Sequence, residues 1–198
     1  KFRVDAPSAG YEYMARANYQ LRKTTNFYAL FRTQVKDINT AAFDSHTNLV
    51  SAGTKTNYIL NADHHINDRW QIKSRLQFST YTINGIKTGG IALVQDVNVT
   101  LEKWNLSGRV ALFDTDDYEN RQFVFEKDVL YAFSIPAYQG IGLRNYLVVQ
   151  YRASDKLRCW VRFARTSYRH TASISSGLEE IAGNVKSDIK LQMMYRFK

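Results

Sequence analysis

The sequence predicts an all-β protein, a transmembrane antiparallel up-and-down β-barrel of about ten strands in a single domain over residues 1–198. Three observations predict it: segments of apolar and polar alternation, short turns that alternate with long loops, and aromatic residues beside the short turns. Alternation with a period of two gives each strand one apolar face and one polar face. A soluble sheet has the same pattern, so the other two observations carry the membrane prediction.

The composition suits strands with two unlike faces. Of the 198 residues, 14% are aromatic and only 2 are proline. No window approaches the roughly 20 apolar residues that a membrane-spanning helix needs, whereas a barrel strand needs only about 9–11 residues. The length favours one domain or one modest barrel. The single Cys159 lies among apolar residues, which predicts an inert buried thiol.

The alternation is clearest at residues 188–198, where Ile189, Leu191, Met193, Tyr195 and Phe197 alternate with mostly polar residues. Bacterial outer-membrane barrels often end on such a strand. The other segments expected as strands are residues 11–20, 27–36, 57–65, 70–78, 91–101, 104–113, 143–153 and 156–166, with a weak candidate at residues 2–6. An even strand number is typical of bacterial barrels. We therefore expect ten strands that close on themselves, or the C-terminal part of a larger barrel.

The connections between these segments have a regular rhythm. Short turns follow Tyr19, Ile66, Leu101 and Ala153, and long loops follow Lys36, Thr82, Phe113 and Thr166. Short periplasmic turns and long extracellular loops are typical of outer-membrane barrels. Between residues 114 and 142 the pattern changes, and residues 121–126 and 129–135 are expected to form an extra hairpin or strand extensions over the barrel mouth. Spacing at residues 176–179 predicts one helical turn with a capping box.

Two sets of side chains support a barrel that is surrounded by membrane and has a water-filled interior. Tyr19, Phe27, Trp70 and Trp104 lie beside short turns on the apolar face, where a membrane-interface aromatic girdle is expected. The net charge is +9, and cations gather on the opposite face. The residues expected to line a basic lumen are Arg16, Arg32, Lys73, Arg75, Arg152, Arg158, Arg162 and Lys190, and Lys36, Arg144 and Arg196 share their face.

Three runs carry a family resemblance: FDTDDY at residues 113–118, DVLYAFSIP at 128–136 and ISSGLEEI at 174–181. They resemble the C-terminal part of Bacteroidota outer-membrane helix-hairpin-helix (competence-like) domain proteins. The resemblance covers about the last half of the chain and implies a Gram-negative outer-membrane barrel that follows an N-terminal region. The helix-hairpin-helix element itself is not visible in this sequence. Nucleic-acid binding is therefore not expected of this segment, and no functional residue is carried over.

Two clusters of ionisable residues are candidates for chemistry. Asp114, Asp116, Asp117 and Glu119 crowd one loop and form a possible cation-binding loop through hard oxygen ligands, with a solvated acidic loop as the alternative. Asp63 and His65 share a strand face, as acidic and His residues do in omptin-like proteases, but they lie at the short-turn end. No nucleophile elbow, phosphate loop or Cys/His metal spacing is present. We expect no enzyme activity, no cofactor and no metal centre.

The expected partners follow from this architecture. Outer-membrane lipid would surround the apolar face. The chain begins Lys-Phe-Arg-Val without Met, so we expect a processed protein or the C-terminal part of a longer one. The first functional hypothesis is a scaffold subunit of a membrane assembly, whose basic lumen is filled by a missing N-terminal region or by another subunit. The alternative is a porin-like component that passes anionic solutes. A soluble lipid-binding barrel is a third possibility.

Overall fold

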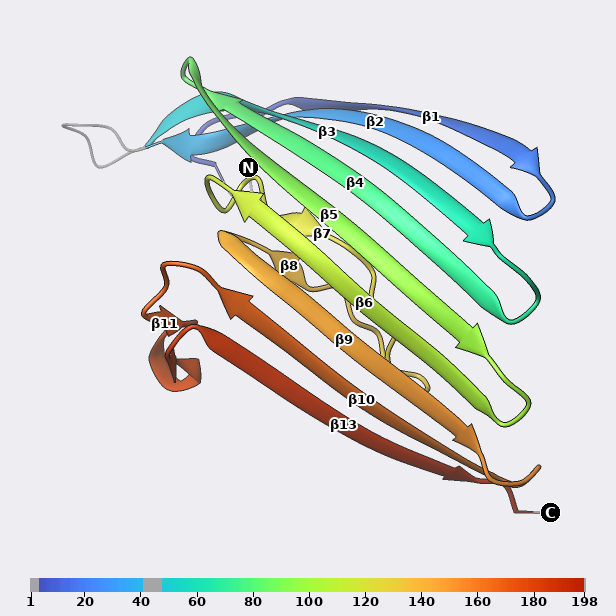
Figure 1. The fold of residues 1–198 in the computed structure, drawn as a ribbon. Coiled ribbons are helices and arrows are strands. Elements are labelled where there is room, and N and C mark those ends of the chain that lie inside the picture. The colour runs from blue at the N-terminus through green and yellow to red at the C-terminus, as the bar shows by residue number, and fades with distance from the viewer. Residues whose placement is uncertain (1–3, 41–47, 198) are drawn as a thin grey trace.

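The computed structural model describes residues 4–40 and 48–197. It is dominated by one antiparallel sheet of nine strands, each paired with the next long strand along the chain (Figure 1). In order across the sheet these strands are β1 (Gly10–Arg22), β2 (Thr25–Thr40), β3 (Leu49–His65), β4 (Trp70–Ile83), β5 (Ile86–Thr100), β6 (Trp104–Thr115), β9 (Ile141–Arg152), β10 (Leu157–Tyr168) and β13 (Val185–Tyr195). The sheet is curved, and among the described residues β1 and β13 form its two borders.

Short elements interrupt this meander at two long connections. Between β6 and β9, β7 (Gln122–Phe123) pairs with β8 (Ala137–Tyr138), and Glu126 bridges to Ser134. Between β10 and β13, β11 (Ser173–Ile174) pairs with β12 (Ile181–Ala182) around a 3₁₀ helix, η1 (Gly177–Glu179). The predicted helical turn is therefore present, but Ser176 makes no side-chain capping bond. No helix in the described part of the chain is both long and apolar enough to cross a membrane.

The all-β prediction and the large antiparallel sheet are confirmed, and barrel closure stays a prediction. Three boundaries differ. Residues 4–6 form bends rather than a strand, and residues 1–3 lie outside the described residues. Asn84 and Gly85 adopt φ values of 50° and 80°, so the long loop expected after Thr82 is a two-residue turn and residues 86–90 join β5. The loop expected at residues 37–55 is shorter, because β2 continues to Thr40 and β3 starts at Leu49.

The two faces of the sheet have opposite polarity and opposite exposure. We call the face that residues 116–140 cover the inner face and the other the outer face. Leu93, which points outward from β5, is 50% exposed, whereas its inward-pointing neighbours Ala92 and Val94 are 0% and 1% exposed. Register places Leu76, Leu93 and Leu112 side by side across β4, β5 and β6. An apolar surface therefore runs across the sheet on the exposed side. The Cys159 thiol also belongs to this face and is only half-buried, contrary to expectation.

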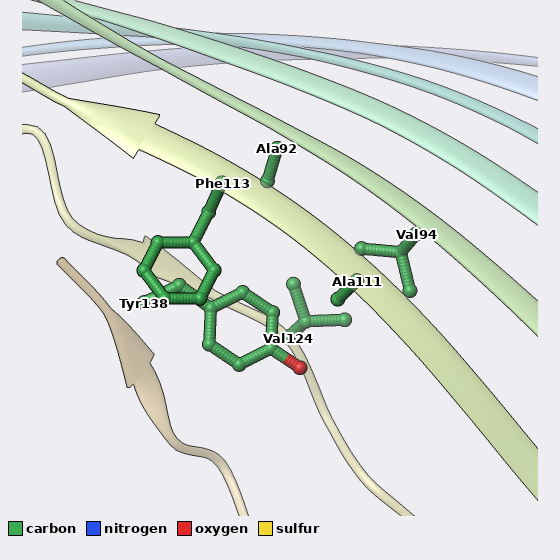
Figure 2. Close-up of a cluster of buried hydrophobic side chains, with 6 residues drawn as sticks. All are labelled: Ala92, Val94, Ala111, Phe113, Val124 and Tyr138. Atoms are coloured by element: carbon green, nitrogen blue, oxygen red, sulfur yellow. The ribbon is translucent and has the colours of Figure 1, made fainter. Parts of the chain in front are cut away.

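Residues 116–140, here called the inner segment, pack against the inner face rather than projecting above the sheet. Figure 1 shows β7 and β8 lying against the sheet near β5, β6 and β9. Figure 2 shows the apolar contact: Val124 and Tyr138 of the inner segment meet Ala111 and Phe113 of β6. The Phe113 and Tyr138 rings stack with centroids 5.2 Å apart. The expected extra hairpin is thus present as short pairings, β7 with β8 and Glu126 with Ser134, but it lies against the inner face and does not project above the sheet.

Candidate functional site

The candidate site is the contact between acidic side chains of the inner segment and cations of the inner face. Glu126 lies at its centre and is 0% exposed. Its two carboxylate oxygens accept hydrogen bonds from Arg144 Nε at 2.6 Å, Arg144 Nη2 at 2.8 Å and Arg162 Nη2 at 2.6 Å. Tyr138 donates its hydroxyl hydrogen to the same carboxylate at 3.0 Å. A buried carboxylate is stable only with such pairing, because removing a charge from water costs several kcal/mol.

A second carboxylate, Asp128, extends this cluster toward the sheet border. Lys190 of β13 lies 2.6 Å from Asp128 Oδ2, and Arg162 Nε lies 3.7 Å from Asp128 Oδ1. Asp188, also on β13, accepts a hydrogen bond from Arg162 Nη1 at 2.5 Å. Three cations, Arg144, Arg162 and Lys190, thus meet three carboxylates, Glu126, Asp128 and Asp188. The charges within this cluster balance, so its three cations are neutralised by carboxylates of the chain itself.

The environment sets the protonation of the two inner-segment carboxyl groups. Burial alone would raise the pKa of Glu126, but the hydrogen bonds and charge of Arg144, with Tyr138 and Arg162, outweigh burial and hold that pKa below its usual value. For Asp128 the same opposition holds: burial raises the pKa, and the hydrogen bonds from Lys190 and the Val129 N–H lower it by more. Both groups are therefore ionised at neutral pH.

A second attachment holds the middle of the inner segment. Arg109 of β6 makes a bidentate ion pair with Asp96 of β5 at 2.5 and 2.7 Å, and its remaining nitrogen donates to the Phe125 carbonyl at 2.7 Å. Lys127 donates to Asn98 Oδ1 at 2.7 Å and to Ser107 Oγ at 3.1 Å. Arg109 is not among the predicted lumen cations, although alternation over residues 104–113 places it on the same face as Asn105 and Ser107.

A third attachment lies at the long-loop end and contains the predicted cation-binding loop. Asp116 accepts the Gly89 N–H at 2.7 Å, and Asp117 accepts the Thr88 hydroxyl at 2.5 Å and the Asn120 N–H at 2.9 Å. Glu119 instead lies 3.8 Å from Arg121, and Asp114 belongs to the outer face by register. Over the described ranges, no group of three or more His, Cys, Asp and Glu is placed to hold a metal ion. The structure thus does not bring the four carboxylates of the possible cation-binding loop, Asp114, Asp116, Asp117 and Glu119, to one point, and Asp116 and Asp117 stabilise the turn instead.

The other half of the inner face is less filled. A cavity of about 440 Å³ lies between β1–β4 and the start of the inner segment. Its charged lining comprises the cations Arg32, Lys36, Lys55 and Arg121 and the carboxylate of Glu119. Arg32 is paired with Glu12 at 2.6 Å, and the Lys55 ammonium donates to the Glu119 carbonyl. Cations thus exceed carboxylates around this cavity, in contrast to the balanced cluster at Glu126.

All the cations predicted to line a lumen occupy the inner face by register. Their partners differ. Arg162 and Lys190 belong to the Glu126 and Asp128 cluster. The others have separate contacts: Arg32 with Glu12, Lys73 with Asp63 at 3.1 Å, Arg75 with the Tyr28 hydroxyl at 2.6 Å, Arg16 with Asn18 at 2.9 Å and Arg152 with the Glu102 carbonyl at 2.9 Å, while Arg158 lies opposite Arg152.

The predicted girdle residues share the outer face and the short-turn end. Register pairs Tyr19 with Phe27 and places Trp70 and Trp104 at the corresponding ends of β4 and β6. All four side chains are exposed. Asp63 and His65 lie near the same end on the inner face, 3.9 Å apart, where Gln71 and Lys73 also contact Asp63. This polar cluster lies far along the strands from the long loops.

The site is therefore a set of ion pairs and hydrogen bonds that fixes the inner segment to the sheet. Its most buried members, Glu126 and Arg162, bond to each other and to neighbouring groups of the chain, and Arg162 Nε alone among the Arg162 nitrogens is buried without a hydrogen-bond partner in the described part of the chain. A scan against protein-family models and a search of the curated proteins found no match to this chain.

Proposed function

We propose that this chain forms the wall of an outer-membrane β-barrel and acts as a scaffold subunit of a membrane assembly, with its own inner segment filling part of the lumen. The observation that carries the proposal is the reversed polarity of the sheet. The inner face carries most of the charged side chains and is covered over its central strands by the inner segment, whereas the outer face is mainly apolar and exposed. A soluble sheet covers its apolar face instead, because burial of apolar surface drives folding in water.

The outer face has the properties that a lipid contact requires. Soluble monomers rarely expose a contiguous apolar patch larger than a few hundred Å², whereas this patch continues across all nine strands by register. The nine strands contain 11 to 17 residues each, enough to cross a membrane at the usual tilt. Exposed aromatic residues at the short-turn end match an interfacial girdle.

The inner segment favours a scaffold over an open channel on the side of β5 to β13. There the lumen face is occupied by Glu126, Asp128 and the apolar cluster around Val124 and Tyr138. A permeant anion would have to displace buried carboxylates from their arginine partners. Breaking a buried ion pair by loss of one partner costs about 3–5 kcal/mol, which disfavours that route.

Passage of anionic solutes is the second candidate, and the cavity along β1–β4 favours it. Rings of Arg and Lys lower the electrostatic barrier for anions in a pore. The cavity of about 440 Å³ has four cations and one carboxylate in its lining. A route for anions would therefore follow the N-terminal half of the inner face.

Depth-dependent quenching of tryptophan fluorescence tests the membrane proposal. The chain has 3 tryptophans, so three variants would each keep one and replace the other two with Phe. In vesicles with lipids brominated near the headgroup, Trp70 and Trp104 should be quenched. Trp160 is 5% exposed on the inner face and serves as the matched control that stays unquenched. Folded protein in which neither Trp70 nor Trp104 responds would overturn the proposal.

A further inference from the structure

We infer that the two border strands, β1 and β13, bind an odd number of additional β-strands that run antiparallel to both, and that a second copy of this chain does not supply them. The inference rests on the proposed membrane function and goes beyond it by defining the partner. The partner is one strand, or a set of three or another odd number, with an apolar outward face.

The first observation is that both borders are open. Within residues 4–40 and 48–197, β1 pairs only with β2, and β13 pairs only with β10. Every second residue of such a border strand directs its N–H and C=O groups away from the sheet. In the hydrocarbon region each unsatisfied group costs several kcal/mol, so lipid-exposed strand edges do not occur there. A membrane sheet of this kind must therefore be completed by further pairing.

The second observation is the exposure of the outer face at a border. Ile189, Leu191 and Met193 of β13 are 68%, 75% and 70% exposed. Val161 and Phe163, which face the same way on the neighbouring strand β10, are 43% and 41% exposed. Because the side chains on both strands point outward, the larger exposed fractions on β13 arise from the lack of a paired strand on its other side among the described residues. The apolar surface thus ends abruptly and would continue onto an adjoining strand.

The third observation, strand direction, determines what can adjoin. Each antiparallel pairing reverses direction, so the first and ninth strands of the sheet run the same way, and both arrowheads point toward the short-turn end in Figure 1. If β1 paired directly with β13 to close a barrel, the two strands at this closing seam would be parallel. Two copies inserted in the same sense across a membrane would create two parallel seams. Only an odd number of intervening strands gives antiparallel pairing at both borders.

The inner face indicates the polarity of the partner. Near the border, the Arg16 guanidinium donates to Asn18 of its own strand, and Lys186 of β13 lies at the opposite border. Neither side chain forms an ion pair with a described residue. A strand whose inward residues carry carboxylates or carbonyl acceptors would therefore complement both borders. Its outward residues would be apolar, in line with Tyr13 and Leu191.

Hydrogen exchange of the intact protein in detergent tests whether the borders are paired. An unpaired border strand exchanges its outward amides quickly, whereas a strand paired on both sides is protected. We expect amides of β1 and β13 to be protected to the level of β3, which is paired on both sides here. Rapid exchange in β1 and β13 beside a protected β3 would overturn the inference.

Cysteine cross-linking then identifies what pairs with the borders. In a Cys159→Ser background, Ala15→Cys on β1 would be combined in turn with Ile189→Cys, Leu191→Cys and Met193→Cys on β13. The matched control is Ala17→Cys with Ala29→Cys, which are directly opposite across β1 and β2 and should cross-link within one chain. We expect no β1–β13 cross-link, because one intervening strand separates the borders by about 10 Å and a disulfide requires Cα atoms within about 7 Å.

The outcomes separate the possibilities. A β1–β13 cross-link within one chain would mean parallel closure of nine strands, and a cross-link between chains would mean a second copy; either overturns the inference. If the tryptophan quenching persists while the border amides exchange rapidly, the inference fails and the membrane proposal stands. If quenching is absent in folded protein, the membrane proposal itself fails.

Discussion

Replacing Glu126 with Gln should release the inner segment from the sheet. Glu126→Gln keeps the size of the side chain and removes the charge that pairs with Arg144 and Arg162. Arg162 would keep Asp188 at 2.5 Å, but Arg144 would retain only a distant contact to Asp188 at 4.0 Å and a hydrogen bond to Thr166. Loss of one partner of a buried pair costs about 3–5 kcal/mol. We take about 3 kcal/mol because one arginine remains paired.

The nine-stranded ladder does not include Glu126, so the cost should fall on attachment of the inner segment and leave the sheet intact. A change of about 3 kcal/mol corresponds to about a 100-fold rise in the population of the released segment. Limited trypsin digestion of folded protein measures this release through cleavage after Lys127, since the cleavage rate follows the opening equilibrium when reclosing is fast.

Two control variants make this test specific. Glu126→Asp keeps the charge on a shorter side chain and should give an intermediate rate of cleavage. Glu179→Gln changes an exposed carboxylate of η1 and should leave cleavage after Lys127 unchanged. An unchanged cleavage rate in Glu126→Gln, with a sheet as stable as in the parent, would refute the role given to this carboxylate.

Three further predictions address pH, lipid contact and conduction. The pKa values of Glu126 and Asp128 in the folded protein lie below their ordinary values of 4.5 and 3.8. The stability that these two carboxylates contribute is therefore complete above their ordinary pKa values and is lost as the pH falls through their lowered pKa values. Hydrogen exchange of residues 124–130, which does not depend on trypsin, should show release of the inner segment on acidification. Leu93→Arg places a charge about 20 Å along β5 from Val99, which lies opposite Trp70 at the level of the girdle, and this position is near the middle of the membrane when the strands have the usual barrel tilt. In a urea titration in lipid, Leu93→Arg should destabilise the protein by about 2–4 kcal/mol. The control Leu178→Arg in η1 should leave the stability unchanged in that titration. In planar bilayers, Lys36→Gln with Lys55→Gln should reduce any anion preference more than Arg162→Gln does, and equal effects would argue against a route along β1–β4.

The large sheet was predictable because its signals are local. Strict alternation in β13 and the polar turn between β1 and β2 are both contained in short runs of sequence. The boundaries that failed depend on finer geometry. Asn84 and Gly85 alone make the turn between β4 and β5, since both accept positive φ, and the glycines that follow belong to a strand. The three glycines in this stretch suggest a long loop, but only Gly85 lies in the turn.

The candidate site was only half visible in the sequence. Its cations lie on strands, where a period of two assigns them to a face, so Arg162 and Lys190 could be placed correctly. Glu126 and Asp128 lie in a segment with almost no regular structure, and no periodicity relates such a segment to the strands it contacts. One local signal was present in the sequence. Glu126 and Asp128 flank Lys127, so an extended chain would direct both carboxylates to the same side, although this stretch lacks the strand pattern of the rest of the sequence.

The position of the inner segment relates the two functional candidates to each other. On the β9–β13 side, three carboxylates balance the three cations of the Glu126 cluster, so this cluster needs no external anion. On the β1–β4 side, four cations and one carboxylate line a cavity, and β1 pairs only with β2 among the described residues. Strands added between β13 and β1 would adjoin both sides at once. If their inward residues carry carboxylates, they would neutralise the cavity and complete a filled scaffold; if those residues are uncharged, the excess of cations would persist and an anion route would remain. The chemistry of the adjoining strands therefore decides between the two candidates.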